Sequence, residues 1–317
     1  MRALFLVLLL LPGLLTAQVV EGPTWVQQED GVEAPLPPSA PDEAPLDLEP
    51  TFNRSPFTVV PEVEVPVLLS LTAVATLPRL FAHEAIESRC GLDCDPEHLL
   101  PFDRVAVGLN VPGANAASDV IMVGAMSLPY LANFIDVAAN KGGVDGWAGY
   151  AADTLVLTET LAAATAATNL FGFLVRRPRP YTYDPGRSDS LRLHPIGQLS
   201  FFSGHAALVM AMGTASARLL QARHPGHPLV PIAWILTASA GTATCFLRPM
   251  AGQHFPSDVL AGAIAGLGIG VLVPALHERN HRARLRRTRS GARPPTVHLL
   301  PGVSPQGGTV SLTLSGW

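Results

Sequence analysis

The chain has 317 residues, of which 48% are hydrophobic and 15% are charged, and its formal net charge is −4. This composition is more apolar than that of a typical soluble domain, and it predicts a protein of the cell envelope. The net negative charge and the lack of a basic–aromatic surface motif argue against nucleic acid as a partner.

The N-terminal residues are typical of a secretory signal. Arg2 precedes an apolar run at 3–15 and then Thr16-Ala17-Gln18, so we expect a signal peptide over residues 1–17. An uncleaved membrane anchor is the alternative, because Leu15 is larger than usual so close to a cleavage site. Residues 18–60 are rich in Pro, Glu and Asp, which predicts a disordered acidic linker.

The main helical domain is predicted over residues 61–280. Its first apolar run, 65–77, is interrupted by Pro78 and falls short of the ~20 residues needed to cross a bilayer, so we expect an interfacial or packed helix there. Cys90 and Cys94 follow in a polar loop. In an exported protein this pair favours a disulfide, with two free thiols as the alternative.

Five apolar helical segments follow, at about 118–139, 147–175, 204–221, 229–247 and 256–276. If all five cross the membrane and the Cys90–Cys94 loop lies outside, the basic turns and the arginine-rich run 279–293 fall inside, in agreement with the positive-inside rule. The sequence therefore predicts an all-α helical bundle with about five membrane-spanning helices.

This topology predicts a location in the inner membrane of a bacterial cell envelope, with the functional site facing the periplasm. Asp136, Asp153 and Glu159 lie within the apolar segments and should face the bundle interior. These acidic residues and the many alanines leave a soluble periplasmic bundle as the alternative.

The segment 147–175 ends in a basic loop, Arg176-Arg177-Pro178-Arg179-Pro180-Tyr181. The prolines stop the helix and restrict the loop. Guanidinium groups are planar forks that bind phosphoryl oxygens well. Taken alone, the loop could also be the basic flank of a membrane span.

Ser203-Gly204-His205 begins the segment 204–221. Ser203 is suited to cap a helix, Gly204 lets backbone N–H groups approach an anion, and a helix N-terminus attracts anions. His205 is placed to protonate a leaving oxygen. The alternative is an ordinary exposed histidine at a helix start.

Arg248, His254 and Asp258 make up a third stretch, at the start of the segment 256–276. Pro256 is tolerated in a first helical turn. The i,i+4 spacing then predicts His254 and Asp258 on one helix face, where the carboxylate would fix the imidazole tautomer for attack on phosphorus. A helix-capping aspartate with a chance histidine nearby is the alternative.

Residues 281–317 are predicted to form a basic tail and a short β-hairpin with strands near 296–300 and 309–314. A single hairpin is marginally stable by itself, and the sequence suggests no function for it.

The order and spacing of the three stretches resembles the signature of the type 2 phosphatidic acid phosphatase superfamily, which also includes bacterial class A acid phosphatases and vanadium haloperoxidases. That signature runs Lys-x6-Arg-Pro, then Pro-Ser-Gly-His, then Ser-Arg-x5-His-x3-Asp. The resemblance covers about residues 100–280, and the matching residues are Arg179-Pro180, Ser203-Gly204-His205, Arg248, His254 and Asp258.

The resemblance implies a phosphatase that works through a phosphohistidine. His254 would be the nucleophile, Asp258 would orient it, and His205 would be the general acid. No cofactor and no metal are expected. The implied phosphate-binding residues are Ser203, Gly204, Arg179 and Arg248.

The chain departs from the signature at three positions. Gly172 stands in place of the lysine, Phe202 in place of the proline, and Leu247 in place of the serine. The missing lysine removes a positive charge from the expected pocket. Arg176, at the end of the same helix, is the candidate to replace it as a phosphate-binding residue.

The sequence therefore predicts hydrolysis of phosphomonoester or pyrophosphate bonds. A lipid phosphate in the membrane is the favoured substrate, because helix ends at the outer face would lie at the level of lipid headgroups. The alternatives are a soluble periplasmic acid phosphatase, a haloperoxidase with vanadate in the phosphate site, and a non-catalytic phosphate-binding protein. The sequence does not indicate the oligomeric state.

Overall fold

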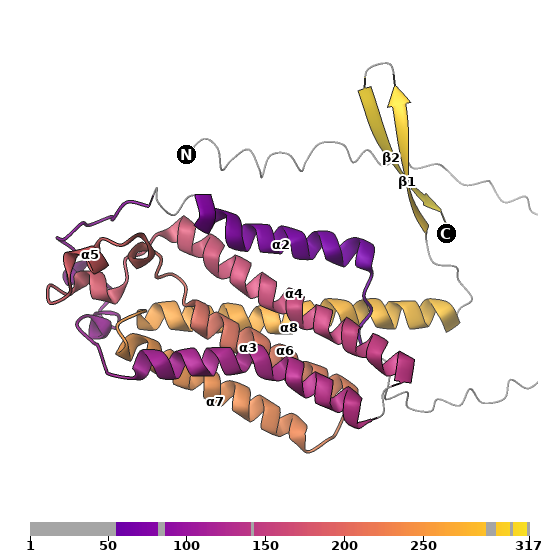
Figure 1. Ribbon diagram of the computed structural model, residues 1–317, viewed down its shortest axis with the longest axis horizontal. Helices are drawn as coiled ribbons and strands as arrows, with labels where there is room; N and C mark the ends of the chain where they lie inside the picture. The colour runs from indigo at the N-terminus through magenta and orange to yellow at the C-terminus, as the bar shows by residue number, and fades with distance from the viewer. Residues whose placement is uncertain (1–54, 82–85, 141–142, 290–295, 305–306, 316–317) are drawn as a thin grey trace, which may run out of the picture. The chain divides into compact units, whose positions relative to one another are not determined.

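The computed structural model describes residues 55–81, 86–140, 143–289, 296–304 and 307–315. The predicted signal peptide, 1–17, and residues 18–54 of the predicted linker lie outside the described residues. Six long helices form a bundle (Figure 1): α2 Pro61–Phe81, α3 Ala114–Ala139, α4 Gly143–Val175, α6 Gly204–Arg223, α7 Leu229–Met250 and α8 Pro256–Arg289. The prediction of an all-α helical bundle is confirmed.

Short elements gather at one end of the bundle, and they connect the long helices around the candidate site (Figure 1). These connections are mostly single turns that begin with proline, which fixes φ at a helical value without losing a needed hydrogen bond. The short elements are η1 Pro96–His98, η2 Arg104–Ala106, η3 Pro180–Tyr183, α5 Asp189–Arg192 and η4 Pro195–Gln198.

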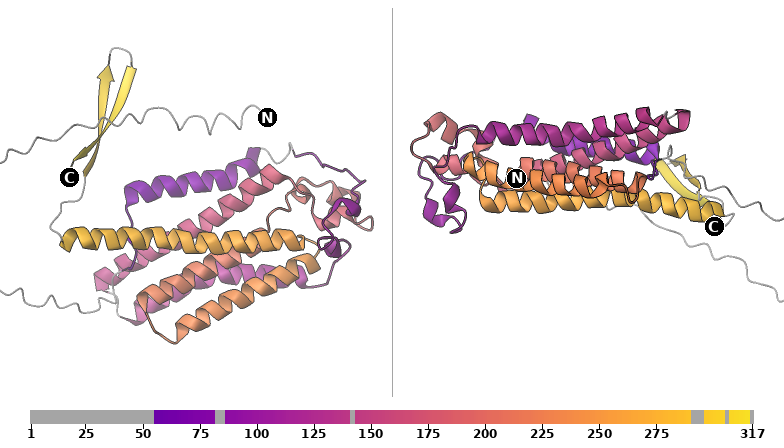
Figure 2. Two further views of the ribbon diagram at one scale, coloured as in Figure 1. Left: turned by 180° about the vertical axis from the view of Figure 1, so that it is seen from behind. Right: turned by 90° about the horizontal axis from the view of Figure 1, so that it is seen from below.

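Helix α6 occupies the middle of the bundle, in contact with α3, α4, α7 and α8. Its buried positions are mostly small, with alanines throughout, so its neighbours can approach its backbone closely. Figure 2 shows α8 lying alongside α6 for much of its length. Glycines at every fourth position of α8 make this approach possible: a Cβ added at Gly262, Gly266 or Gly270 would overlap the α6 backbone.

Four helices among the described residues are long and apolar enough to cross a membrane: Pro61–Pro78 of α2, Ala114–Ala139, Leu229–Met250 and Pro256–Arg279. Three coincide with predicted spans. The prediction that the first apolar run is too short was wrong, because Pro66 and Pro78 are contained within a helix of 21 residues.

The predicted spans 147–175 and 204–221 form α4 and α6, but neither is among the four helices apolar enough by composition. Their place in the bundle explains the difference. A helix covered by other helices has no need for a strongly apolar surface.

Asp153 and Glu159 are buried in the bundle interior, as predicted. Asp153 pairs with Arg223 at the end of α6, whose side chain is only 5% exposed. Arg223 therefore neutralises a buried carboxylate instead of lying free in a turn. Asp136 is half-buried and lies 2.9 Å from Nε2 of His224.

Strands β1 Thr296–Ser304 and β2 Gly307–Ser315 pair in antiparallel register, with Thr296 opposite Ser315. They extend beyond the residues predicted for each strand. No role follows from this pairing.

Candidate active site

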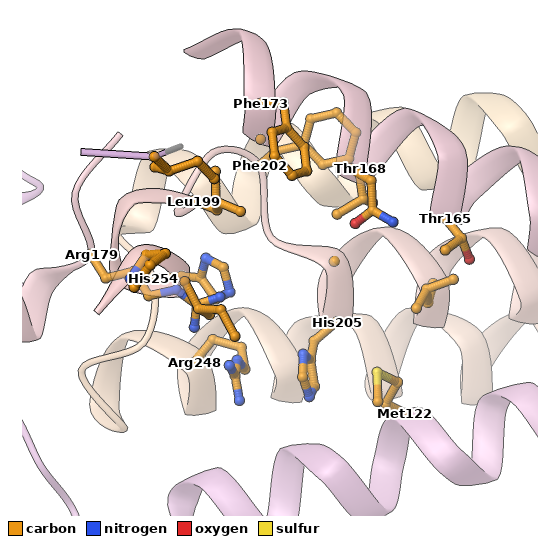
Figure 3. A pocket seen from close by; sticks show the side chains of 17 residues that line it. Met122, Thr165, Thr168, Phe173, Arg179, Leu199, Phe202, His205, Arg248 and His254 are labelled. Atoms are coloured by element: carbon orange, nitrogen blue, oxygen red, sulfur yellow. The ribbon is translucent and has the colours of Figure 1, made fainter. Parts of the chain in front are cut away.

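The three stretches predicted to carry the chemistry converge on one cavity of about 480 Å³. Figure 3 shows Arg179, His254 and Arg248 grouped at one side of it, with His205 next to Arg248. The remaining walls come from α3, α4, α6 and the loops before them. These walls are mainly apolar or weakly polar, and include Ile86, Met122, Thr165, Thr168, Phe173, Ile196, Leu199, Phe202 and Leu208.

His254 lies in the short link between α7 and α8, with 3% of its surface exposed. Its Nδ1 is 2.8 Å from the backbone oxygen of Ser200, which can only accept, so Nδ1 carries the hydrogen. Nε2 has no hydrogen-bond partner among the described residues. Burial, together with the positive charges of Arg179 and Arg248, holds the pKa of His254 well below its usual value. His254 is therefore a neutral imidazole with one nitrogen available to the cavity.

The predicted direct contact between Asp258 and His254 was wrong. Helix α8 begins at Pro256, so His254 precedes the helix and does not share a face with Asp258. The Asp258 carboxylate accepts hydrogen bonds from the Phe255 N–H at 3.1 Å and from the Ser200 hydroxyl at 2.5 Å. Asp258 therefore reaches the imidazole indirectly, through the residue whose carbonyl holds Nδ1.

Arg177 is a structural partner that the sequence reasoning missed. Its guanidinium donates to Asp258 at 2.6 Å and to Asp103 at 2.7 Å, and it lies 4.2 Å from the centre of the Phe255 ring. Burial alone would lower the pKa of Arg177, but the two carboxylates raise it. Both carboxylates are fully buried, so Arg177 neutralises charges that would otherwise be costly.

Arg179, two residues further on, faces the cavity and donates to Gln253 at 2.8 Å. Arg248 joins it from the end of α7, donating to Asn115 at 2.7 Å and to Ser118 at 3.1 Å. The Arg248 Nε is buried and has no partner among the described residues. Both arginines predicted to bind phosphate therefore line the same cavity.

Arg176 does not join them, so the prediction that it replaces the missing lysine was wrong. It adopts a left-handed backbone conformation with φ of 49°, and its exposed side chain donates back to the Phe173 carbonyl at 3.1 Å. Gly172, at the lysine position, does line the cavity.

Ser203 caps α6 as predicted, with its hydroxyl accepting from the Ala206 N–H at 3.5 Å. This hydroxyl is fully buried and does not line the cavity, so Ser203 positions the helix and does not contribute a phosphate ligand. Gly204 lines the cavity, and its N–H has no partner among the described residues. The Gly204 N–H is therefore available to donate to an anion at the start of α6, as the sequence predicts.

His205 lines the cavity, and its Nε2 lies 2.7 Å from Asp119 on α3. Asp119 is a second residue that the sequence reasoning missed. It also accepts from Asn115 at 2.9 Å and lies 3.8 Å from Arg248. The polar residues Asn115, Ser118 and Asp119, spaced i, i+3 and i+4 at the start of an otherwise apolar helix, were the available signal.

Cys90 and Cys94 form the predicted disulfide, with their Cα atoms 4.9 Å apart. The loop that they close is attached to the segment before α6, because Arg192 donates to the Leu92 carbonyl at 2.7 Å. Ile86, just before this loop, contributes to the cavity wall. The disulfide thus stabilises a loop next to the cavity.

The match to a family model covers much of this bundle: residues 153–282 match the PAP2 superfamily. This match confirms the resemblance seen in the sequence. Two curated relatives, the decaprenylphosphoryl-5-phosphoribose phosphatases of two Mycobacterium tuberculosis strains, are each 32% identical over 123 residues, which is 39% of this chain and 60% of the relative. The chain therefore spans about three-fifths of the length of these relatives.

Among solved structures, the chain is similar to the transmembrane PAP2 type phosphatidylglycerolphosphate phosphatase from Bacillus subtilis. The two share 21% sequence identity with a TM-score of 0.40, and the match covers 68% of this chain and 96% of the other.

Proposed function

We propose that this protein is a phosphatase that hydrolyses a phosphomonoester or pyrophosphate bond of a membrane lipid through a phosphohistidine on His254. One observation carries the proposal. A neutral, oriented imidazole lies in the same cavity as two arginines and a second histidine, in a chain whose residues 153–282 match the PAP2 superfamily.

In the first step, Nε2 of His254 attacks the phosphorus atom. The bond between phosphorus and the leaving oxygen breaks, and a bond between nitrogen and phosphorus forms. His205 gives its proton to the leaving oxygen. Asp119, 2.7 Å from His205, stabilises the imidazolium form that supplies this proton.

In the second step, a water molecule replaces the leaving group. His205, now neutral, takes a proton from the water as its oxygen attacks phosphorus. The nitrogen–phosphorus bond breaks, inorganic phosphate is released, and both histidines return to their starting states.

Arg179, Arg248 and the Gly204 N–H would hold the non-bridging oxygens. Charge accumulates on these oxygens in the transition state, and donors already fixed in place stabilise it at little reorganisation cost. Arg248 is 3% exposed and is held by Asn115 and Ser118, so it is fixed before the substrate arrives.

The rest of the cavity supports a lipid as the substrate class. Beyond the charged group, its walls are largely apolar side chains between α3, α4 and α6, which suit part of a lipid better than a sugar. The curated relatives are named as phosphatases of decaprenylphosphoryl-5-phosphoribose, which supports a lipid-linked phosphate.

The proposed location is the inner membrane of the cell envelope, with the site facing the periplasm. The disulfide lies at the end of the bundle that holds the site, and disulfides persist in oxidising compartments. The basic C-terminal part of α8 extends from the opposite end, as expected for a cytoplasmic side. No cofactor is part of this proposal.

The test is a phosphate-release screen on protein purified in detergent, with phosphatidic acid, phosphatidylglycerol phosphate and a polyprenyl diphosphate beside the soluble p-nitrophenyl phosphate. We expect lipid substrates to be preferred, and vanadate to inhibit by occupying the phosphate site. His254→Ala should abolish release. The control His227→Ala, which changes an exposed histidine before α7, should leave release unchanged.

Three results would contradict the proposal. Full activity in His254→Ala would show that His254 is not the nucleophile. Preference for the soluble ester would favour a broad acid phosphatase, and bromide oxidation after vanadate loading would favour a haloperoxidase.

A further inference from the structure

A second group of buried ionisable side chains lies away from the active site, where α2, α4 and α8 meet. It consists of Glu64, Glu159 and His277, which are 7%, 3% and 4% exposed. Each residue offers one ligand atom, and these atoms lie within 4.8 Å of one another. His277 is about 30 Å along α8 from the helix start beside His254, at 1.5 Å per residue. None of the three lines the active-site cavity.

The imidazole of His277 is oriented by the backbone. Its Nδ1 lies 3.1 Å from the carbonyl oxygen of Thr58, and because a carbonyl can only accept, this nitrogen carries a hydrogen. The other nitrogen, Nε2, is directed at the Glu159 carboxylate, 2.8 Å away. Histidines that bind metals characteristically donate their second nitrogen to a carbonyl or carboxylate in this way.

The group can carry an unbalanced charge. If both carboxylates are ionised they carry two negative charges, of which a protonated His277 would neutralise one. No arginine or lysine forms an ion pair with Glu64 or Glu159 in the part of the chain that the structure describes.

One carboxylate oxygen also lacks a partner. Oε1 of Glu159 is buried and accepts no hydrogen bond from any described residue. A buried carboxylate oxygen without a donor or a cation is costly, so this oxygen points to a missing positive ligand.

We propose that Glu64, Glu159 and His277 bind a divalent transition-metal ion, with Zn²⁺ as the best fit. A divalent ion balances the two carboxylates while His277 stays neutral. One imidazole with two carboxylates is a donor set that suits Zn²⁺, whereas Ca²⁺ and Mg²⁺ prefer oxygen alone.

The spacing is compatible with this ion. Zinc–ligand bonds of about 2.0–2.2 Å in a tetrahedron separate the ligand atoms by roughly 3.3 Å. Nε2 of His277 and Oε2 of Glu159 are 2.8 Å apart, somewhat closer than that value. The carboxylate of Glu64 lies 3.7 Å from the other ring nitrogen, Nδ1, so the Glu64 side chain would rotate toward Nε2 to complete the site.

The site would join α2 to the rest of the bundle. Helix α2 precedes the segment 153–282 that matches the superfamily, whereas Glu159 and His277 lie within it. The ion would therefore stabilise the packing of α2 against α4 and α8 and take no part in the phosphatase chemistry. This inference does not depend on the proposed function.

The test is metal binding by the full chain, purified in detergent through a tag without histidines and stripped with a chelator. Equilibrium dialysis against Zn²⁺, followed by elemental analysis, gives the stoichiometry and affinity. Glu159→Gln is the test variant, and Glu64→Gln serves as a second if the first is not recovered. Glu278→Gln, the neighbour on α8 that pairs with Arg218, is the matched control. His254→Asn excludes binding by the active-site His254.

We expect one equivalent of Zn²⁺ per chain in the wild type, in Glu278→Gln and in His254→Asn, and an increase in their apparent Tm on binding. Glu159→Gln should bind at least about tenfold more weakly, since even residues that only support a ligand account for about 10- to 100-fold in affinity. Two results would overturn the inference. The first is a wild-type protein that binds no Zn²⁺, which would mean that a proton shared among the three side chains balances their charge. The second is equal binding of Zn²⁺ by the wild type and by Glu159→Gln.

Discussion

Arg177 and Arg179 are separated by one proline, yet the structure predicts opposite consequences for their loss. Arg177 neutralises Asp103 and Asp258, both fully buried, and it does not line the cavity. Arg179 faces the cavity beside His254. We therefore expect Arg177→Ala to reduce stability and Arg179→Ala to reduce catalysis.

The magnitudes can be worked from the contacts. Removing one partner of a buried ion pair costs about 3–5 kcal/mol, and Arg177 is 18% exposed with two such pairs. At about 2–4 °C per kcal/mol for a chain of this size, Arg177→Ala should lower the apparent Tm by roughly 6–20 °C. Loss of one transition-state donor typically costs about 10²–10³ in kcat, which we expect for Arg179→Ala.

The assays are thermal unfolding in detergent and phosphate release, measured on both variants. Arg177→Lys provides an intermediate case if Arg177→Ala does not fold, because lysine keeps the charge but loses the fork that reaches both carboxylates. The reasoning is refuted if Arg177→Ala and Arg179→Ala lose similar amounts of activity at unchanged Tm, or if Arg179→Ala is the less stable of the two.

Three further predictions follow from the site. Asp119→Asn should slow hydrolysis of substrates with poor leaving groups by about 10²-fold or more and spare activated aryl phosphates, because it weakens the proton donor; an equal loss on both would contradict this role. Since His254 has a pKa well below 6.5 and attacks as the neutral imidazole, lowering the pH through 6.5 should leave it active, and a pH profile of kcat/KM with an acid midpoint at 6.5 would contradict this. Gly172→Lys should lower the KM roughly tenfold, because it adds a charged donor to the cavity. The side chain can be accommodated, since a Cβ at Gly172 would make ordinary contacts at 3.7 Å with Leu199 and Phe201. Arg176→Ala changes an exposed side chain and should leave the KM unaltered.

The helices were predictable from the sequence because their interiors are apolar and their starts carry recognisable residues. Ser203 and Pro256 mark the first turns of α6 and α8. Helix α6 begins at Gly204 as predicted, whereas α8 begins at Pro256 and excludes His254, which the i,i+4 spacing had placed on it. The first apolar run was underestimated because a proline was taken to end it. Pro78 lies in the last turns of α2, where the rest of the helix is already formed.

The site was predictable where one short stretch of sequence contains both the residue and the local structure that positions it, as for His205 at the start of α6. It was not predictable where a side chain acts on a distant segment. Asp103 is 74 residues from Arg177, and Asp119 is 86 residues from His205. Local spacing does not reveal such pairs, and the same limit led to the assignment of Asp258 as a direct partner of His254.

The relative position of the two histidines proposed to act in catalysis depends on residues that lie outside the cavity. The Ser203 N–H donates to the backbone oxygen of Asp258 at 3.0 Å, which fixes the start of α6 against the first turn of α8. Gly262, one helical turn further along α8, faces the Ser203 backbone so closely that any side chain would push the two helices apart. Because His205 begins one helix and His254 immediately precedes the other, such a displacement would separate the proton donor from the nucleophile. The distance between them is therefore set by helix packing, and we expect catalysis to depend on a glycine that would not touch the substrate.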